Sequence, residues 1–453
     1  MKLNSFIVFA GALIGAISLV SPAAAKEPVT LRIDVDRTVL PAHTTDKAIL
    51  KIALDGVKIP RSEVRPPVNL ALVIDRSGSM SGDKIAKARE AALEAVRQLA
   101  PDDVVGVIAY DTTVETLVPA QRVGNRRRLE VAIQSLEATG NTALYGGVVR
   151  GADEVRRHSE DSRYINRVIL LSDGQANVGP SSPEELGRLG TALMREGIAV
   201  TTIGLGLGFN EDLMTRLAQR SDGNTYFVED SSDLPRIFAA ELGDVLSIVA
   251  RRVVIEIEFP EGVRPLRFVG RDGKIREGKA ELTLNQLYGG QEKFALVEVE
   301  VSPEKDGAER EIARARVSYE DTVRQRNATL TATRKITFSA SEKDVVKSAD
   351  HRVQADYAAN EIANAKDEAI ALVDANRRQE AGLLLRERAE KLSAMAQVYG
   401  NTAVQRAAAP AAAAADRVER EGLGNAERKA YRAESAQTRN QQASGGGYDN
   451  STR

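Results

Sequence analysis

The 453-residue sequence contains no cysteine and no tryptophan, and it has only three histidines. Without cysteine, neither disulfide bonds nor lipid attachment through a thiol can form. The histidines, His43, His158 and His351, are scattered, and no His-Glu-x-x-His occurs, so the usual zinc hydrolase motif is excluded. Aromatic residues make up 4% of the chain and the formal net charge is −2. A nucleic-acid-binding surface is therefore not indicated.

Motifs of several enzyme classes are also missing. The chain has neither the Gly-x-x-x-x-Gly-Lys-Ser/Thr loop of nucleotide hydrolases nor the Gly-x-Ser-x-Gly turn of serine hydrolases. Gly204, Gly206 and Gly208 follow an apolar run, but their Gly-x-Gly-x-Gly spacing differs from the dinucleotide-binding fingerprint. We therefore expect this segment to be a loop at the edge of a sheet.

One long hydrophobic run is present, at the start of the chain. Lys2 precedes an apolar stretch over residues 6–20, and small residues follow up to Ala25. This order is typical of a secretory signal, and we predict that residues 1–25 are removed after export. An uncleaved anchor is the alternative, because the run approaches the length that spans a bilayer. No later run is that long, so we expect no transmembrane span after signal removal.

A carboxylate and two hydroxyls are predicted to share a strand-to-helix turn. Asp75, Ser77 and Ser79 follow the apolar run 68–74 and precede a helical pattern that begins near Lys84. In an open parallel α/β sheet, ligands bind at the carboxyl ends of the strands. Oxygen ligands at that position suit a hard cation such as Mg²⁺.

Two later segments supply a third hydroxyl and a second carboxylate. Thr142 lies in a loop after Gly140, and Asp173 with Gly174 ends another apolar run. Asp-x-Ser-x-Ser, then this threonine, then Ser-Asp-Gly after a strand, together resemble the metal-ion-dependent adhesion site of von Willebrand factor type A domains.

The resemblance implies a role for each of the five residues. Ser77, Ser79 and Thr142 would approach the metal by their hydroxyls, whereas Asp75 and Asp173 would hold it mainly through water. Mg²⁺ is the expected ion, with Mn²⁺ or Ca²⁺ as alternatives. Neutral hydroxyls would leave the charge of the ion under-neutralised, so an open coordination position should attract a partner's carboxylate. The same serines and glycines would alternatively be turn and cap residues only.

Three further charged features could assist the predicted site. Asp111, at the end of a second predicted strand, either orients a metal-bound water or is a turn residue with Thr112. Arg76 and the run 126–128 could steer an acidic partner, although a charge run on a helix is usually a solvated face.

The pattern of apolar residues predicts two folded parts before residue 340. Residues 67–246 alternate short apolar runs with helical segments, which is typical of a doubly wound, Rossmann-like α/β sheet. The order fits a von Willebrand type A domain. Residues 250–340 alternate apolar and polar positions and predict an antiparallel β-sandwich, and residues 26–66 show the same alternation. We therefore expect the α/β domain to be inserted in or flanked by one β-sandwich.

Helical spacing returns after the predicted sandwich. Residues 345–400, with a polar break at 374–378, predict an α-helical hairpin. Residues 403–453 are first alanine-rich and then glycine-rich. Such low-complexity composition predicts a disordered tail, with transient helix over residues 417–434.

The whole layout resembles bacterial envelope proteins labelled calcium-activated chloride channel homologues and, distantly, inter-alpha-trypsin inhibitor heavy chains. The type A stretch carries nearly all of this resemblance. The channel label implies a conducting protein, but no apolar run after the signal segment spans a membrane. Conduction is therefore not expected.

These features predict an exported, non-enzymatic binding protein in the periplasm or at the cell surface of a Gram-negative bacterium. It would dock an Asp or Glu of a partner protein through the metal. One alternative is an envelope scaffold that binds through the sandwich or the hairpin. Another is a Mg²⁺-dependent hydrolase with Asp75 as nucleophile. Phosphatases of the haloacid-dehalogenase type, however, carry a second aspartate where this chain has Ser77.

Overall fold

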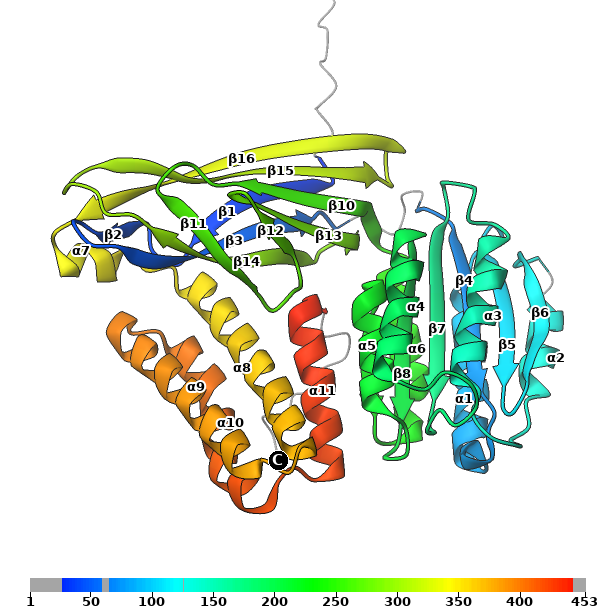
Figure 1. Cartoon of the computed structure of the whole chain (residues 1–453). Helices are drawn as coiled ribbons and strands as arrows, with labels where there is room; N and C mark the ends of the chain where they lie inside the picture. Colours follow the sequence, from blue (N-terminus) through cyan, green and yellow to red (C-terminus); the bar gives the residue numbers. More distant parts are fainter. Residues whose placement is uncertain (1–26, 59–64, 125, 443–453) are drawn as a thin grey trace, which may run out of the picture.

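The computed structural model describes residues 27–58, 65–124 and 126–442. The predicted signal segment, residues 1–25, lies outside these ranges. The described chain forms an α/β domain, a pair of β-sheets and a layer of C-terminal helices (Figure 1). The predicted fold class, an α/β doubly wound domain joined to a β region and followed by helices, is confirmed.

The α/β domain contains a six-stranded sheet with the strand order β6-β5-β4-β7-β8-β9. Strand β6 runs antiparallel to β5, and the other neighbours pair in parallel. Strands β4, β5, β7 and β8 are buried along nearly their whole lengths, which explains their continuous apolar runs. The strands are β4 (Val68–Asp75), β5 (Val104–Tyr110), β6 (Val114–Arg122), β7 (Ile165–Ser172), β8 (Ile198–Leu205) and β9 (Thr225–Val228).

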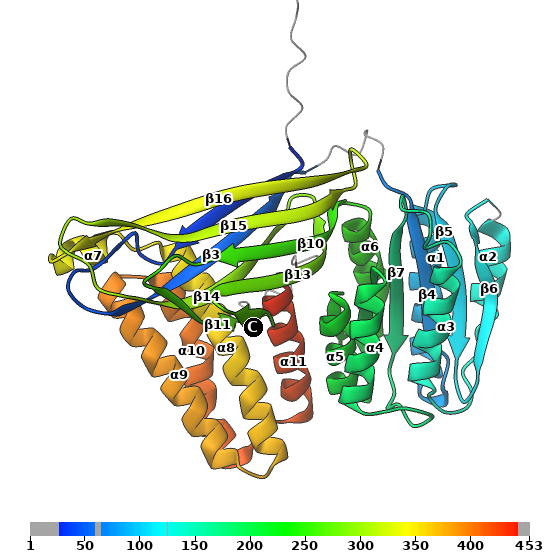
Figure 2. The same ribbon diagram turned by 45° about the horizontal axis from the view of Figure 1, so that its top comes forward.

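Helices cover both faces of this sheet (Figures 1 and 2). Helices α1, α2 and α6 share one hydrophobic core with the sheet, and α3, α4 and α5 share the other. Helix α4 begins with a capping box, because the Ser182 side chain accepts from Glu185 N and Pro183 follows. The helices are α1 (Asp83–Gln98), α2 (Arg126–Gln134), α3 (Leu144–Arg156), α4 (Pro183–Arg195), α5 (Glu211–Ser221) and α6 (Leu234–Val245).

The β region consists of two sheets that enclose one core. The smaller sheet has the order β1-β3-β14-β11 and the larger β12-β13-β10-β15-β16-β2. Strand β3, which precedes the α/β domain in the chain, pairs with β14, which follows it. The α/β domain is therefore inserted between strands of one β unit. The strands are β1 (Val29–Val35), β2 (Val39–Pro41), β3 (Asp46–Gly56), β10 (Ile248–Glu258), β11 (Val263–Val269), β12 (Lys274–Arg276), β13 (Lys279–Tyr288), β14 (Glu292–Val301), β15 (Glu309–Asp321) and β16 (Arg326–Ser339).

The prediction of a disordered tail from residue 403 is wrong over most of that segment. After α7 (Glu342–Lys347), α8 (His351–Asp374) and α9 (Arg378–Tyr399), the chain forms α10 (Thr402–Glu421) and α11 (Asn425–Asn440). Alanines of α10 are buried against α9, where small side chains permit close packing. Alanine also has the highest helix propensity, so an alanine-rich composition is compatible with a packed helix as well as with disorder.

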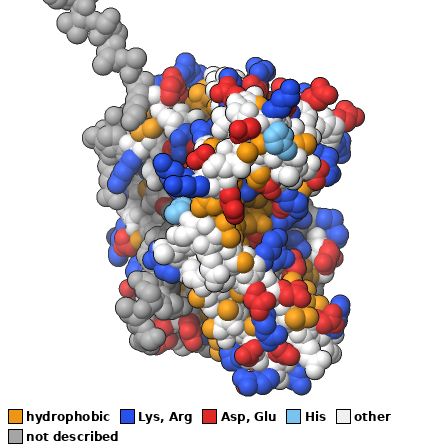
Figure 3. Space-filling model, turned by 90° about the vertical axis from the view of Figure 1, so that its left-hand side faces the viewer, with side chains coloured by type: hydrophobic (Ala, Val, Ile, Leu, Met, Phe, Trp, Pro, Cys, Tyr) orange, Lys and Arg blue, Asp and Glu red, His pale blue; other side chains and the backbone are white. Residues whose placement is uncertain are grey.

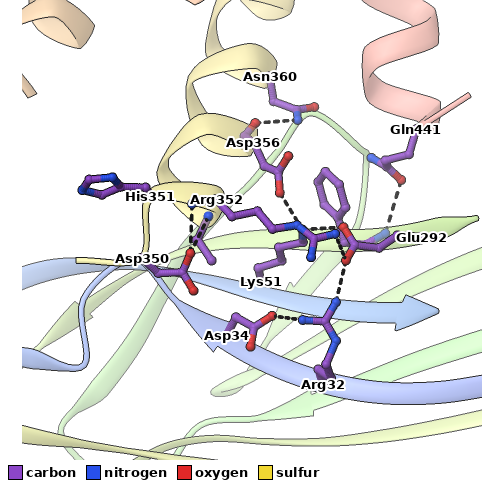
Figure 4. A network of polar contacts seen from close by, with 12 residues as sticks. Arg32, Asp34, Lys51, Glu292, Asp350, His351, Arg352, Asp356, Asn360 and Gln441 are labelled. Atoms are coloured by element: carbon purple, nitrogen blue, oxygen red, sulfur yellow. Dashed lines mark hydrogen bonds and ion pairs between the residues drawn. The ribbon is translucent and has the colours of Figure 1, made fainter. Parts of the chain in front are cut away.

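Buried and partly buried ion pairs fasten α8 to the outer face of the smaller sheet (Figure 4). The Lys51 side chain, on β3, is 1% exposed, and its ammonium contacts Glu292 of β14 and Asp356 of α8. Arg32 of β1 and Arg352 of α8 both reach the same Glu292, at 2.6 and 2.7 Å. Elements distant in sequence are therefore held by one carboxylate.

Helix α11 lies between α8 and the α/β domain (Figures 1 and 2). Strand β9 is the last strand of the sheet order. Residues at and just after the end of α11 form hydrogen bonds with the backbone of Thr225 in this strand. Gln437 Nε2 donates to Thr225 O at 3.0 Å, and Thr225 N donates to Gln442 Oε1 at 3.0 Å. The buried Lys429 donates to Phe209 O at 2.6 Å and pairs with Glu211. The C-terminal helix therefore covers a sheet edge that would otherwise be open.

Arg167 of β7 is fully buried where the α/β domain meets the β region. Its Nη2 donates to Tyr288 OH of β13 at 2.7 Å, and its Nη1 lies 3.7 Å from Glu241 Oε1 of α6. Glu241 also accepts from Asn224 Nδ2 at 2.8 Å and from Tyr226 OH at 3.0 Å. One buried carboxylate therefore serves several donors at the junction of the two parts.

Asp244, at the end of α6, makes stability depend on pH. Burial, and then the charge of Glu241, raise the pKa of Asp244 from 3.8 to about 7, although Arg167 and Lys293 oppose the rise. Between these two values the folded chain retains a proton that the unfolded chain has released, so the free energy of unfolding falls as the pH rises. We expect the wild type to lose roughly 2 kcal/mol between about pH 5 and 8 relative to Asp244→Asn. Urea unfolding of both proteins at the two pH values checks this, and parallel pH profiles would contradict it.

On the face in Figure 3, acidic and basic side chains are interspersed. Within residues 27–58, 65–124 and 126–442, no helix has the length and hydropathy needed to cross a membrane.

Candidate metal site

Three loops meet at the carboxyl ends of β4 and β7, the two central strands of the α/β sheet. The first loop joins β4 to α1, the second precedes α3, and the third follows β7. Gly78 N donates to Gly140 O at 3.0 Å, which holds the first loop to the second. Thr142 N donates to Asn177 Oδ1 at 2.8 Å, which holds the second loop to the third.

The three predicted hydroxyls face one point beside Gly174. A Cβ placed on this glycine would lie 2.9 Å from Thr142 Oγ1, 3.5 Å from Ser79 Oγ and 3.7 Å from Ser77 Oγ. The Oγ atoms of Ser77 and Ser79 are 3.1 Å apart. Gly174 therefore leaves room, at the centre of the hydroxyls, that any larger residue would fill.

The two predicted carboxylates lie directly beside the hydroxyls. Asp173 Oδ1 accepts from Ser79 Oγ at 2.6 Å. Asp75 Oδ1 accepts from Ser77 N at 2.8 Å, and its Oδ2 accepts from Ser172 Oγ at 2.6 Å. The structure thus brings all five predicted residues together, and their binding of a metal stays a prediction.

Burial differs sharply across this cluster. Asp75 and Asp173 are 0% and 1% exposed, whereas Ser79 is exposed to solvent. Burial raises the pKa of Asp75; hydrogen bonds from Ser172 and Ser77 oppose this rise, and the negative charge of Asp173 adds to it. The carboxylates of the site are therefore buried, whereas the hydroxyl of Ser79 lies on its solvent-exposed side.

Arg76 and Asp111, for which the sequence left alternatives open, contact each other beside the cluster. Arg76 Nε lies 3.0 Å from Asp111 Oδ2, and Arg76 Nη1 lies 2.9 Å from Glu115, so Arg76 is bound to acids of its own domain. Asp111 is buried and also accepts from Thr113 N at 2.7 Å. Burial alone would raise the pKa of Asp111, but Thr113 and Arg76 together lower it. Asp111 therefore fixes the turn that carries Thr113, and its carboxylate is occupied by Arg76.

Two residues at the site were not predicted from the sequence. Ser172 positions Asp75, and Lys84 of α1 pairs its ammonium with Asp173 Oδ2. Ser172 directly precedes Asp173, so its closeness could have been anticipated. Lys84 gave no comparable signal, because its partner lies 89 positions away.

Across the described residues, no group of three or more His, Cys, Asp or Glu side chains is placed to hold a metal ion. A metal at the β4–β7 edge would therefore depend on hydroxyl oxygens for part of its coordination.

Comparison with known proteins agrees with this fold. Residues 69–240 match the family profile of the von Willebrand factor type A domain, and the chain contains such a domain. An uncharacterized protein of Synechocystis is 31% identical over 194 residues, which are 43% of this chain and 45% of that protein. YfbK of Escherichia coli is 27% identical over 253 residues, covering 55% of this chain and 43% of YfbK.

An animal protein also matches. A human inter-alpha-trypsin inhibitor heavy chain is 29% identical over 205 residues, covering 43% of this chain and 22% of its own. This chain therefore matches less than half of the length of each of these relatives. The expected resemblance to type A domain proteins is confirmed.

Two solved structures share the architecture over most of the chain. A von Willebrand factor type A protein from Catenulispora acidiphila has a TM-score of 0.65 and 17% identity, and covers 84% of this chain and 90% of its own. An ArnB paralog from Sulfolobus acidocaldarius has a TM-score of 0.60 and 16% identity, and covers 91% and 98%. At these identities the comparison shows the fold alone.

Proposed function

We propose that this protein is an exported, non-enzymatic binding protein whose type A domain docks an Asp or Glu of a partner protein through a divalent cation. Mg²⁺ is the proposed ion, with Mn²⁺ or Ca²⁺ as alternatives. The observation that carries the proposal is the convergence of three hydroxyls on one point beside two buried carboxylates. The proposed location, the periplasm or cell surface of a Gram-negative bacterium, rests on the signal-like sequence of residues 1–25.

The side chains fit a hard cation. Oxygen atoms from Ser77, Ser79 and Thr142 surround the point beside Gly174, and the acidic pair Asp75 and Asp173 supplies the balancing charge. A bound ion would supply a positive charge that neutral hydroxyls leave partly uncompensated. Because Ser79 is exposed, a carboxylate from outside can reach this position.

The burial of Asp75 favours binding over catalysis. A carboxylate nucleophile must reach its substrate, but Asp75 is 0% exposed and both of its oxygens accept hydrogen bonds. We therefore assign Asp75 the role of holding the site together. Turnover in a phosphatase or peptidase panel that disappears with Asp75→Asn would contradict this assignment.

The first test compares two serines of the same loop. Ser79→Ala removes a hydroxyl from the cluster and is expected to weaken Mg²⁺ binding about tenfold or more. Ser81→Ala is the matched control, because Ser81 is exposed and its Oγ donates to Gly78 O at 2.7 Å, outside the cluster. Isothermal titration calorimetry with Mg²⁺ and Mn²⁺ gives both affinities. Equal losses in the two variants would mean that the hydroxyl does not bind the ion.

The second part of the test concerns the partner. Envelope proteins are captured on the purified chain with Mg²⁺, with EDTA, and on the Ser79→Ala variant. Capture that needs both Mg²⁺ and Ser79 supports the proposal. Capture that is equal in all three would place binding on the β-sheets or the C-terminal helices and remove the metal from the function.

A further inference from the structure

Lys84 lies in the first turn of α1, at the edge of the candidate metal site. Its ammonium pairs with Asp173 Oδ2 and lies 3.3 Å from Ser79 O. The other oxygen of Asp173 accepts from Ser79 Oγ. The lysine and the serine hydroxyl therefore use both carboxylate oxygens that would support a metal ion.

The exposures of the two side chains are unequal. The Asp173 side chain is 0% exposed, whereas that of Lys84 is 35% exposed. A lysine is a compact charge on a flexible stem, so its ammonium can leave for solvent while the buried aspartate cannot.

We propose that the Lys84 ammonium balances the charge of Asp173 when no metal is bound and competes with the divalent ion for this carboxylate. This inference rests on the proposed function. Without metal, Asp75 and Asp173 are two buried negative groups, and the ammonium offsets their repulsion. When a divalent ion approaches the hydroxyls, the same ammonium repels it. Lys84 therefore stabilises the metal-free protein and lowers its metal affinity.

Lys84→Met separates these two effects, because methionine keeps most of the side-chain length and loses the charge. We expect Mg²⁺ and Mn²⁺ to bind about tenfold more tightly to Lys84→Met than to the wild type at equal ionic strength. In EDTA the variant should unfold about 2 °C lower, because the acidic pair has lost its counter-charge. Mg²⁺ should then raise its Tm more than it raises that of the wild type.

Two further variants serve as controls. Lys84→Arg keeps the charge and should bind the metals nearly as the wild type does. Lys87→Met removes a lysine from the same helix, where it pairs with Glu90 at 2.8 Å, and should leave metal affinity nearly unchanged. Calorimetric titration and thermal unfolding are measured for all four proteins.

The outcomes distinguish this inference from the proposed function. Metal binding by the wild type with equal or weaker binding by Lys84→Met would overturn the competition alone, and weaker binding would make Lys84 a positioning residue for Asp173. Metal binding by neither protein would overturn the proposed function and this inference with it. Binding by Lys84→Met at concentrations where the wild type binds nothing would support the competition strongly.

Discussion

Asp75→Asn is expected to weaken Mg²⁺ binding by about 10- to 100-fold, because the loss of a carboxylate that supports a metal site typically costs that much affinity. The substitution keeps the shape of the side chain. The carbonyl oxygen of the new amide can still accept from Ser77 N, and its NH₂ group can donate to Ser172 Oγ, so both local hydrogen bonds remain possible. The loss should therefore come from the missing charge and not from a distorted loop.

Thermal unfolding in EDTA supplies the control for this variant. Burial and the charge of Asp173 raise the pKa of Asp75, so the ionised carboxylate costs the metal-free protein free energy. Asp75→Asn should thus unfold at an equal or higher temperature in EDTA while binding Mg²⁺ poorly. Unchanged Mg²⁺ affinity in a folded Asp75→Asn protein would show that this carboxylate does not support a metal.

Glu241→Ala is expected to lower the free energy of unfolding by about 3–5 kcal/mol, the usual cost of leaving a buried charge without its partner. Arg167 would remain buried, and Asn224 and Tyr226 would lose their acceptor. Because Arg167 also donates to Tyr288 of β13, the damage should reach the contact between the α/β domain and the β region.

Urea unfolding measures the loss of stability, and two further variants serve as comparisons. Glu241→Gln removes the charge and one accepting oxygen but keeps the other oxygen as an acceptor, so it should cost less than Glu241→Ala. Glu94→Ala, on the outer side of α1 where the glutamate side chain is 38% exposed, should change stability by less than about 0.5 kcal/mol. A loss below about 1 kcal/mol for Glu241→Ala would show that Arg167 finds other compensation.

The α/β domain could be predicted well because its signals are local. Strands buried on both faces produce unbroken apolar runs, as in β4 and β7, and a cap such as Ser182 with Pro183 marks a helix start within a few residues. The positions of Asp75 and Asp173 directly after two such runs also placed them at one edge of a parallel sheet. The convergence of Thr142 with them followed from the type A resemblance.

The C-terminal segment could not be predicted in the same way. An alanine-rich sequence such as 407–415 favours a helix by propensity but buries little surface alone. Packing against α9 and α8, with Ala411 and Ala415 buried in the shared core, makes α10 stable in the folded chain. Composition without a packing partner cannot distinguish a packed alanine helix from a disordered one.

The sequence by itself predicted the alternation of strands and helices in the α/β domain, its position inside or beside the β region, and the five oxygen-bearing residues at the β4–β7 edge. These depend on periodicity and on neighbours along the chain. The tertiary structure alone decided that Lys84 pairs with Asp173, that Glu241 serves Arg167, and that α11 covers β9. Such contacts join charged and polar groups distant in sequence, and their strength depends on a burial that exists only after the chain has folded.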